Sequence, residues 1–211
     1  MKKEVESGYL LGKIDELLDR VGCPICDLTF ESVDDNIDAL FYENVNDPSE
    51  RKKFSAGPGF CSKHLKMVED HLKVHPELGI LGVSVLYGTL SEDLQKVGDG
   101  NKIEFGENCQ LCAIERDSEK RYLDLFAQYI SNDERLKKYE NSVSMLCLRH
   151  FNELTKNPNI NPDFKRVQSS KMEKVLNALK EFIRKSDYRY SKEPVSLMEG
   201  EAWRMISKFL S

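Results

Sequence analysis

The sequence contains Cys23-Pro24-Ile25-Cys26 and, after residues 27–60, Cys61-Ser62-Lys63-His64. The same arrangement recurs as Cys109-Gln110-Leu111-Cys112 and, after residues 113–146, Cys147-Leu148-Arg149-His150. Every position in the second set follows its counterpart at a constant interval, as Cys109 follows Cys23, and all six cysteines of the chain belong to the pattern. A copied spacing that leaves no cysteine over indicates an internal duplication and two Cys3His metal sites.

The residue types explain why this spacing favours a metal. Two cysteines at i and i+3 turn their sulfurs toward one point when the first lies in a tight turn and the second on the first turn of a helix. A Cys-x2-His pair does the same, and Pro24 is a residue that starts helices well. Four such ligands surround one ion tetrahedrally, which is the closed geometry of structural zinc. We expect two zinc ions per chain, bound by Cys23, Cys26, Cys61, His64, Cys109, Cys112, Cys147 and His150.

Other uses of the cysteines remain open. Disulfides are not favoured, because the charged N-terminal segment 1–20 has no apolar core typical of a secretion signal. Buried inert cysteines do not explain the copied spacing. An iron–sulfur cluster is an alternative cofactor, because thiolates are suitable ligands for both. The spacing also does not decide whether each site forms within one copy or whether the copies exchange ligand pairs.

Length and composition are those of a globular protein. The 211 residues allow one large domain or two small ones, with 40% hydrophobic and 32% charged residues. The formal net charge of −5 does not favour a nucleic-acid partner, and no apolar stretch is long enough to span a membrane. We therefore expect a cytoplasmic protein without a membrane partner.

Apolar residues recur at helical spacing after both Cys-x2-Cys motifs. Helices are predicted to leave Cys26 and Cys112 and to end near Asn46-Asp47 and Asn132-Asp133. The predicted fold class is all-α, with the metal knuckles at helix N-termini. A linker with Gly98, Gly100 and Gly106 separates the copies. The predicted segments are residues 1–100 (first metal-binding repeat), 101–160 (second metal-binding repeat) and 161–211 (a C-terminal helical segment packing on the repeats).

The structural roles of three further segments are predicted from their apolar and basic patterns. The apolar stretch 78–90 is predicted to be a buried core helix, with a subunit interface as the alternative. A long helix after Pro162 has a basic face over residues 165–185, which is interpreted as a solvated face rather than a nucleic-acid site. In a last helix over 199–210, Trp203 is predicted to pack in the core with Ile206 and Phe209.

Several motifs together resemble a known family. They are Cys23-Pro24-Ile25-Cys26, Gly59-Phe60-Cys61, Leu146-Cys147, Arg121-Tyr122-Leu123 and the tail Asp187-Tyr188-Arg189. This combination, which extends over nearly the whole chain, resembles an uncharacterised prokaryotic family of duplicated Cys-Pro-x-Cys and Cys-x2-His proteins. The resemblance implies a helical protein with two ligand sets and no assigned reaction. The chain has Gln110 and Leu146 where its first copy has Pro24 and Phe60.

The motifs do not point to an enzyme. Two closed Cys3His sites offer no open coordination position, and the sequence has no phosphate loop or nucleophile elbow. The expected function is a zinc-stabilised scaffold or adaptor for another macromolecule or a small ligand. The alternatives are an iron–sulfur, redox or metal-handling protein, and a nucleic-acid-binding protein that uses the basic helix. His71 and His75, with Glu69 or Glu77, form a weaker candidate for a third metal site.

Overall fold

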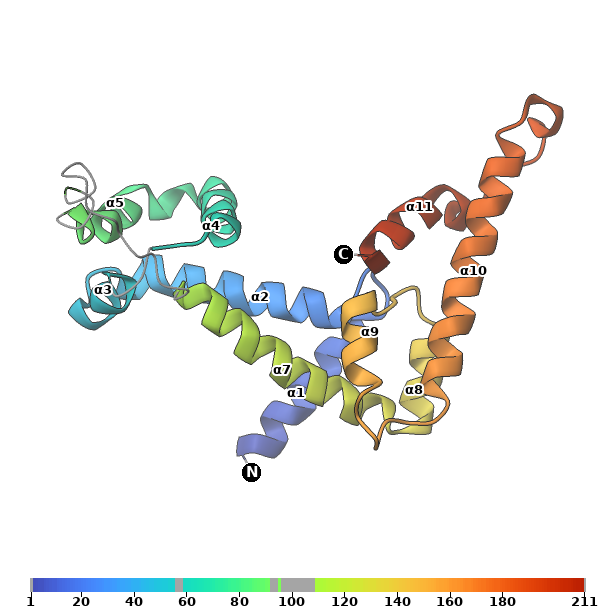
Figure 1. Ribbon diagram of the computed structural model, residues 1–211, viewed down its shortest axis with the longest axis horizontal. Helices are drawn as coiled ribbons and strands as arrows, with labels where there is room; N and C mark the ends of the chain where they lie inside the picture. The colour runs from blue at the N-terminus through green and yellow to red at the C-terminus, as the bar shows by residue number, and fades with distance from the viewer. Residues whose placement is uncertain (1, 56–58, 92–94, 96–108, 211) are drawn as a thin grey trace. The chain divides into compact units, whose positions relative to one another are not determined.

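The computed structural model describes residues 2–55, 59–91, 95 and 109–210, and within these ranges every element of regular secondary structure is helical (Figure 1). The all-α prediction is therefore confirmed for the described part of the chain. The predicted boundary between residues 100 and 101, with the glycine linker around it, lies outside the described residues. Among the described helices, none is long and apolar enough to cross a membrane.

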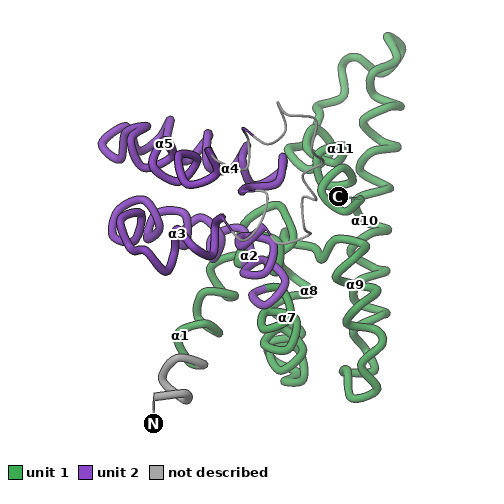
Figure 2. The backbone as a smooth tube through the Cα atoms, turned by 60° about the vertical axis from the view of Figure 1, so that its left-hand side comes forward, with its two compact units in different colours: residues 1–28, 119–211 green, residues 29–118 purple. Residues whose placement is uncertain are grey.

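The chain forms two compact units (Figure 2). Unit 1 contains residues 1–28 and 119–211, and unit 2 contains residues 29–118. The chain passes from unit 1 to unit 2 within helix α2 (Pro24–Ala39) and returns within helix α7 (Gln110–Ile130). Unit 2 is thus an insertion into the sequence of unit 1. The predicted division into residues 1–100, 101–160 and 161–211 stays a prediction.

Unit 1 is built around large aromatic and aliphatic side chains. Its helices are α1 (Lys2–Leu17), α8 (Asp133–Asn141), α9 (Leu148–Leu154), α10 (Phe164–Lys185), α11 (Leu197–Leu210), the start of α2 and the end of α7. Phe126, Tyr129, Tyr139 and Phe164 are fully buried. The hydroxyl of Tyr139 donates to Gln168 and accepts from the Leu146 N–H at 3.0 Å, so this phenol has partners on both sides.

The C-terminal part of unit 1 is a helical hairpin. Figure 1 shows α11 beside α10, after the short 3-10 helix η3 (Tyr188–Tyr190). Lys185 pairs with Glu199 at 2.8 Å across the hairpin. The packing predicted for Trp203 is wrong: its side chain is 55% exposed, and the neighbouring Ala202 and Met205 are buried instead. Ile206 and Phe209, which were predicted to pack with Trp203, are partly buried against the cluster that contains Ala202 and Met205, and Arg204 stacks on the exposed indole.

Unit 2 has its own core. Its helices are the rest of α2, the π-helical turn η1 (Leu40–Asn44), α3 (Pro48–Ser55), α4 (Ser62–Val74), η2 (Pro76–Leu78), α5 (Leu81–Gly88) and the start of α7. The rings of Phe54, Phe60 and Tyr87 meet edge to face, with Phe54 and Phe60 centroids 5.0 Å apart. The stretch predicted as one buried helix divides into η2 and α5. In that stretch Leu86 is fully buried, but Ile80 is 79% exposed, so the expected burial holds only in part.

The Asn-Asp pairs lie where the preceding helices end, as predicted, and each pair begins a new helix, but not with the same residue. Asp47 accepts from the Ser49 N–H at 2.7 Å ahead of α3, whereas Asn132 accepts from the Arg135 N–H at 3.1 Å ahead of α8. Either side chain satisfies a backbone donor that the first turn leaves free. The two helices therefore start one position apart relative to the copied spacing.

Candidate metal centres

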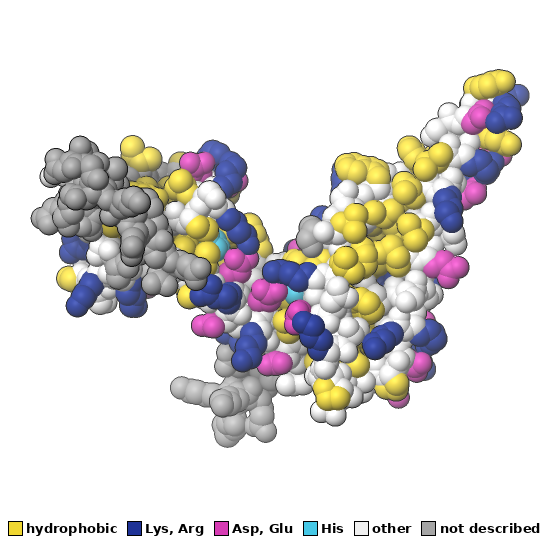
Figure 3. Space-filling view, viewed as in Figure 1, with side chains coloured by type: hydrophobic (Ala, Val, Ile, Leu, Met, Phe, Trp, Pro, Cys, Tyr) yellow, Lys and Arg dark blue, Asp and Glu magenta, His cyan; other side chains and the backbone are white. Residues whose placement is uncertain are grey.

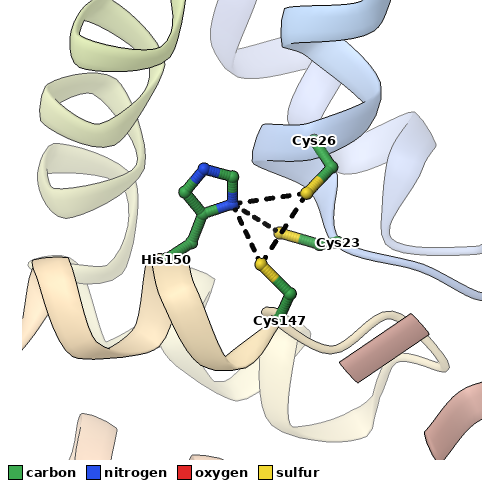
Figure 4. Close-up of side chains that lie close together, drawn as sticks. All are labelled: Cys23, Cys26, Cys147 and His150. Atoms are coloured by element: carbon green, nitrogen blue, oxygen red, sulfur yellow. Dashed lines mark hydrogen bonds between the residues drawn. The ribbon is translucent and has the colours of Figure 1, made fainter. Parts of the chain in front are cut away.

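The eight predicted ligands come together in two groups, and each group takes one pair from each copy. Cys23 and Cys26 lie beside Cys147 and His150 (Figure 4). Cys61 and His64 lie beside Cys109 and Cys112. The Cys-x2-Cys pair of each sequence set thus joins the Cys-x2-His pair of the other set, a pairing that the spacing left undecided. All ligands of the first group, site 1, belong to unit 1, and all ligands of the second, site 2, belong to unit 2.

In site 1 the four side chains converge on a common point. The Nδ1 atom of His150 is 3.3 Å from the sulfurs of Cys23 and Cys147 and 3.4 Å from that of Cys26. The sulfurs of Cys26 and Cys147 are 3.7 Å apart. Cys26 is half-buried and the other three residues are buried, so the site is almost closed to solvent.

Site 2 repeats this geometry with more exposure. The Nδ1 atom of His64 is 3.2, 3.3 and 3.5 Å from the sulfurs of Cys61, Cys112 and Cys109. The sulfurs of Cys61 and Cys112 are 3.6 Å apart. Cys61 and Cys112 are half-buried, whereas His64 and Cys109 are buried. Two ligands of site 2 are thus partly accessible to solvent, compared with one ligand of site 1.

Backbone pairing brings the two halves of site 1 together. The N–H of Ser144 donates to the carbonyl of Leu18 at 3.2 Å, and the N–H of Met145 donates to that of Gly22 at 2.9 Å. These bonds join the segments directly before Cys147 and Cys23. Gly22 has φ +152, and a Cβ there would lie 3.3 Å from Nζ of Lys208. Glycine therefore suits both the positive φ and the limited space at this position, directly before the first Cys-x2-Cys motif.

The two Cys-x2-His turns have the same backbone conformation. Cys61 is the N-cap of α4 with φ −67 and ψ 163, and Cys147 is the N-cap of α9 with φ −67 and ψ 162. Hydrogen bonds from the thiols of Cys23 and Cys26 lower the pKa of Cys147. Burial opposes ionisation of Cys61, but the backbone N–H of His64 and the neighbouring thiols outweigh it and lower that pKa. In each site one thiol therefore ionises more readily than a free cysteine does.

Other thiols hold their protons when no ion is present. Burial, followed by hydrogen bonding to Cys147, raises the pKa of Cys23 well above its usual value. Burial also raises the pKa of Cys112 to about 12. A bound cation replaces these protons, because thiolates rather than thiols are metal ligands.

A carboxylate lies behind each histidine. Nε2 of His150 is 2.8 Å from Glu119, which also pairs with Arg149 at 3.2 Å. Nε2 of His64 is 3.4 Å from Glu115 and has no hydrogen-bond partner among the described residues. Burial lowers the pKa of His64, whereas in His150 the contacts with Cys147 and Cys26 outweigh burial and raise the pKa to about 10.

These carboxylates were missed at the sequence level. Glu115 and Glu119 follow Cys112 by three and seven residues and therefore share its face of α7. The basic residue before each histidine, Lys63 or Arg149, contacts the carboxylate of its own site. The sequence signal that could have found the two carboxylates was their helical spacing from the ligand Cys112. In metal sites such carboxylates orient the imidazole and raise its basicity.

The distances are those expected around a single ion. A tetrahedral zinc with Zn–S bonds of about 2.3 Å holds its sulfurs about 3.8 Å apart, close to the 3.6 and 3.7 Å found here. A cluster attaches thiolates to different iron atoms and so requires wider separations. Disulfides require contact at about 2.05 Å, and all six cysteines are free. The donor sets therefore fit one thiophilic ion each.

The weaker histidine candidate has a different arrangement. His71 is buried, with Nδ1 2.8 Å from Asp34 and Nε2 3.4 Å from Asp38. His75 stacks on it and contacts Glu77 at 3.1 Å. Among the described residues, the groups with converging metal ligands are the two Cys3His sets. The His71 contacts join α4 to α2 within unit 2.

Most of the cations on the basic face of α10 have partners within the protein. Lys171 is buried, Arg166 contacts Asp163 and Glu140, Arg184 contacts Glu181 and Glu193, and Lys185 pairs with Glu199. Most of the cations that would face a phosphate backbone thus already have carboxylate or carbonyl partners. This arrangement supports the solvated-face interpretation.

The fold and the two sites define an all-helical protein with a pair of Cys3His groupings that could bind metal. The chain belongs to a family of unknown function, DUF6062, whose model matches residues 90–210. It is also 26% identical over 198 residues to an uncharacterized 23.9 kDa protein in the xynA 3' region of Caldicellulosiruptor sp. (strain Rt8B.4), covering 90% of this chain and 94% of that protein. These matches confirm the resemblance to an uncharacterised family. No solved structure matches.

Proposed function

We propose that each Cys3His group binds one zinc ion and that the protein is a zinc-stabilised helical scaffold for another macromolecule or a small ligand. The observation that carries this proposal is the convergence of four ligand atoms at separations of 3.2 to 3.7 Å in both groups. Three thiolates and one imidazole complete a tetrahedral shell around zinc. Such a shell has no position for a substrate or a reactive water, so the zinc is structural.

The charges around each site suit a bound zinc ion. Zinc with three thiolates and a neutral imidazole has a net charge of about −1. Arg149 pairs with Glu119 and Lys63 pairs with Glu115, so the carboxylate behind each histidine is neutralised and adds no further negative charge. The reduced state of the thiols, on which zinc binding depends, agrees with a cytoplasmic location.

The scaffold part of the proposal depends on exposed apolar surface in unit 1. Figure 3 shows hydrophobic side chains gathered over α10 and α11. The exposed large hydrophobic residues of these helices are Leu176, Ile183, Leu197, Met198, Trp203 and Leu210. Surfaces of this kind mark binding sites on monomeric proteins. We therefore assign partner or ligand binding to the C-terminal hairpin and stability to the metal sites.

Elemental analysis and an absorption spectrum of anaerobically purified protein test the metal assignment. We expect close to two zinc ions per chain, one for each group, and no visible band. Cys61→Ser is expected to lose one zinc and much of the stability of unit 2, because binding of structural zinc contributes folding free energy. Iron with sulfide and a brown absorbance would overturn the proposal in favour of the cluster alternative.

A further inference from the structure

A cavity of about 360 Å³ lies in unit 1, beside the segment that joins α8 to α9. Most of its wall is apolar and comes from Val21, Val143, Met145, Val175, Leu197, Met198 and Met205. The volume is at the lower end of the range for small-molecule pockets. Three methionines in one wall give an adaptable lining, because the unbranched thioether fits different apolar shapes. None of these residues belongs to a metal site.

A buried ammonium group forms part of the same wall. Lys171 is 5% exposed, and its Nζ donates to the carbonyls of Tyr139 at 2.5 Å and Ser142 at 2.6 Å. The ring of Tyr139 lies 4.7 Å from this nitrogen. Among the described residues, no carboxylate lies within ion-pair distance of Nζ. Carbonyls and an aromatic ring satisfy the donors but leave the positive charge without a counter-ion.

The other charges at the cavity increase this imbalance. Lys174 follows Lys171 by one turn of α10, lines the cavity and is exposed, with no ion pair to any described residue. The two carboxylates at the rim already have cationic partners. Glu140 contacts Arg166 at 3.4 Å, and Glu201 contacts Arg204 at 3.1 Å. The cavity therefore combines an apolar interior with two lysines that form no ion pair with a described carboxylate.

We propose that this cavity binds a small amphipathic anion, a medium-chain carboxylate, with its chain among the methionines and its head group at Lys174. Lys171 attracts the anion through its charge, because its own N–H groups are already used. Lys174 supplies free donors for a direct charge-assisted hydrogen bond. This inference deepens the proposed function by naming the class of small ligand that the scaffold takes.

The test is a titration of zinc-loaded full-length protein with decanoate, observed through labelled methionine methyl groups. We expect the signals of Met145, Met198 and Met205 to shift together and to saturate. Met67 lies in unit 2 and serves as the internal control. Met172 packs against the cluster of Met145 and Met205 but lines a separate cavity with Phe209, so its signal reports binding there. Decanol and decyltrimethylammonium have the same chain length without the negative charge. Both are expected to bind more weakly than decanoate.

Three variants separate charge from shape. Lys174→Ala is expected to weaken decanoate binding about threefold to fivefold, because a partly solvated ion pair is lost. Val143→Glu changes a half-exposed wall residue and is expected to abolish binding through like-charge repulsion without disturbing the buried core. Lys165→Ala, an exposed position of α10 outside the cavity, is the matched control and should bind as the unmodified protein does.

The outcomes distinguish this inference from the metal proposal. Zinc content is measured on the same samples, so protein without zinc refutes the proposed function by itself. Zinc-loaded protein whose three cavity methionines do not respond refutes the anion site alone. Shifts confined to Met172 place the ligand in the other cavity, and equal binding of decanol and decanoate removes the role of the lysines. Both results overturn the proposal.

Discussion

At the scale of single residues, the two sites differ most in how their histidines are held. His150 has a direct carboxylate contact through Nε2, whereas the Nε2 of His64 has only a carboxylate oxygen 3.4 Å away. A hydrogen bond at Nε2 fixes the tautomer in which Nδ1 is free to bind a metal. Site 1 is therefore the better oriented site and the less exposed one.

Glu119→Gln is expected to lower the metal affinity of site 1 about tenfold to a hundredfold, as removal of such carboxylates does in other metal sites. The matched change Glu115→Gln should lower the affinity of site 2 by less, because Glu115 makes no hydrogen bond to His64. Competition with a chromophoric chelator gives both affinities. Equal losses at the two sites would contradict the difference in orientation.

Lys171 makes the stability of unit 1 depend on pH. Burial, and next the charge of Lys174, lower the pKa of Lys171 from 10.5 to about 8 in the folded protein. Between these two values the unfolded chain binds more protons, so the free energy of unfolding attributable to this group rises as the pH is raised. Tyr139, Glu140, Lys174 and, from α11, Glu201 are the charged or titratable groups around it.

The measurement is urea unfolding of the unmodified protein and of Lys171→Met at pH 7.5 and pH 9.5. The unmodified protein should gain stability relative to the variant over this interval. The difference between the two proteins cancels the titration of unrelated groups. A difference that stays constant with pH, or reverses in sign, would show that Lys171 keeps an ordinary pKa.

At the scale of elements, the turn before α4 places Cys61. Gly59 has φ +81, and a Cβ there would lie 3.1 Å from the ring of Phe54. Gly79 has a comparable φ of +63, but a Cβ there would meet no atom within 4 Å. Both positions thus have a positive φ, and only one of them is crowded.

Gly79→Ala is expected to lower the free energy of unfolding by about 1 kcal/mol through the strained backbone alone. Gly59→Ala should cost about 2 kcal/mol or more, since the contact with Phe54 adds to the strain. Chemical unfolding of zinc-loaded protein compares them. A similar cost for both substitutions would mean that the Phe54 ring moves aside freely.

Some elements could be predicted from the sequence because their pattern was local. The helix starting at Phe164 has a long apolar stripe, and its observed bounds agree with the prediction. Trp203 was misplaced because helical spacing fixes which residues share a face but not which face the neighbouring helix covers. The ligands themselves were identifiable from spacing, whereas Glu115 and Glu119 had only the weaker signal of helical spacing from Cys112.

At the scale of the whole molecule, the exchange of ligand pairs was beyond sequence reasoning. Local spacing is the same for both pairings, and only tertiary packing distinguishes them. Ser32 of α2 and Ser118 of α7 show the same relationship between the two helices. Their hydroxyls are 2.8 Å apart, and the same interval of 86 residues that separates the ligand sets separates them. Equivalent positions of α2 and α7 thus touch each other.

Paired substitutions test this exchange. Cys61→Ser and Cys109→Ser should each remove the same zinc, so the double variant still binds one ion at site 1. Cys23→Ser combined with Cys61→Ser should leave no zinc. If each copy held its own ion, the two double variants would give the opposite results, and metal analysis of purified protein decides between them.

In the sequence, all ligands of site 2 lie between the two ligand pairs of site 1, and this nesting sets an order of events during synthesis. All ligands of site 2 lie between residues 61 and 112, inside the interval from Cys26 to Cys147 that site 1 must close. The inner site becomes complete while the C-terminal hairpin is still untranslated, and the shorter chain closure costs less entropy. On the ribosome, unit 2 can therefore acquire its ion and fold first. The ligands of site 1 then come together only after unit 2 has folded.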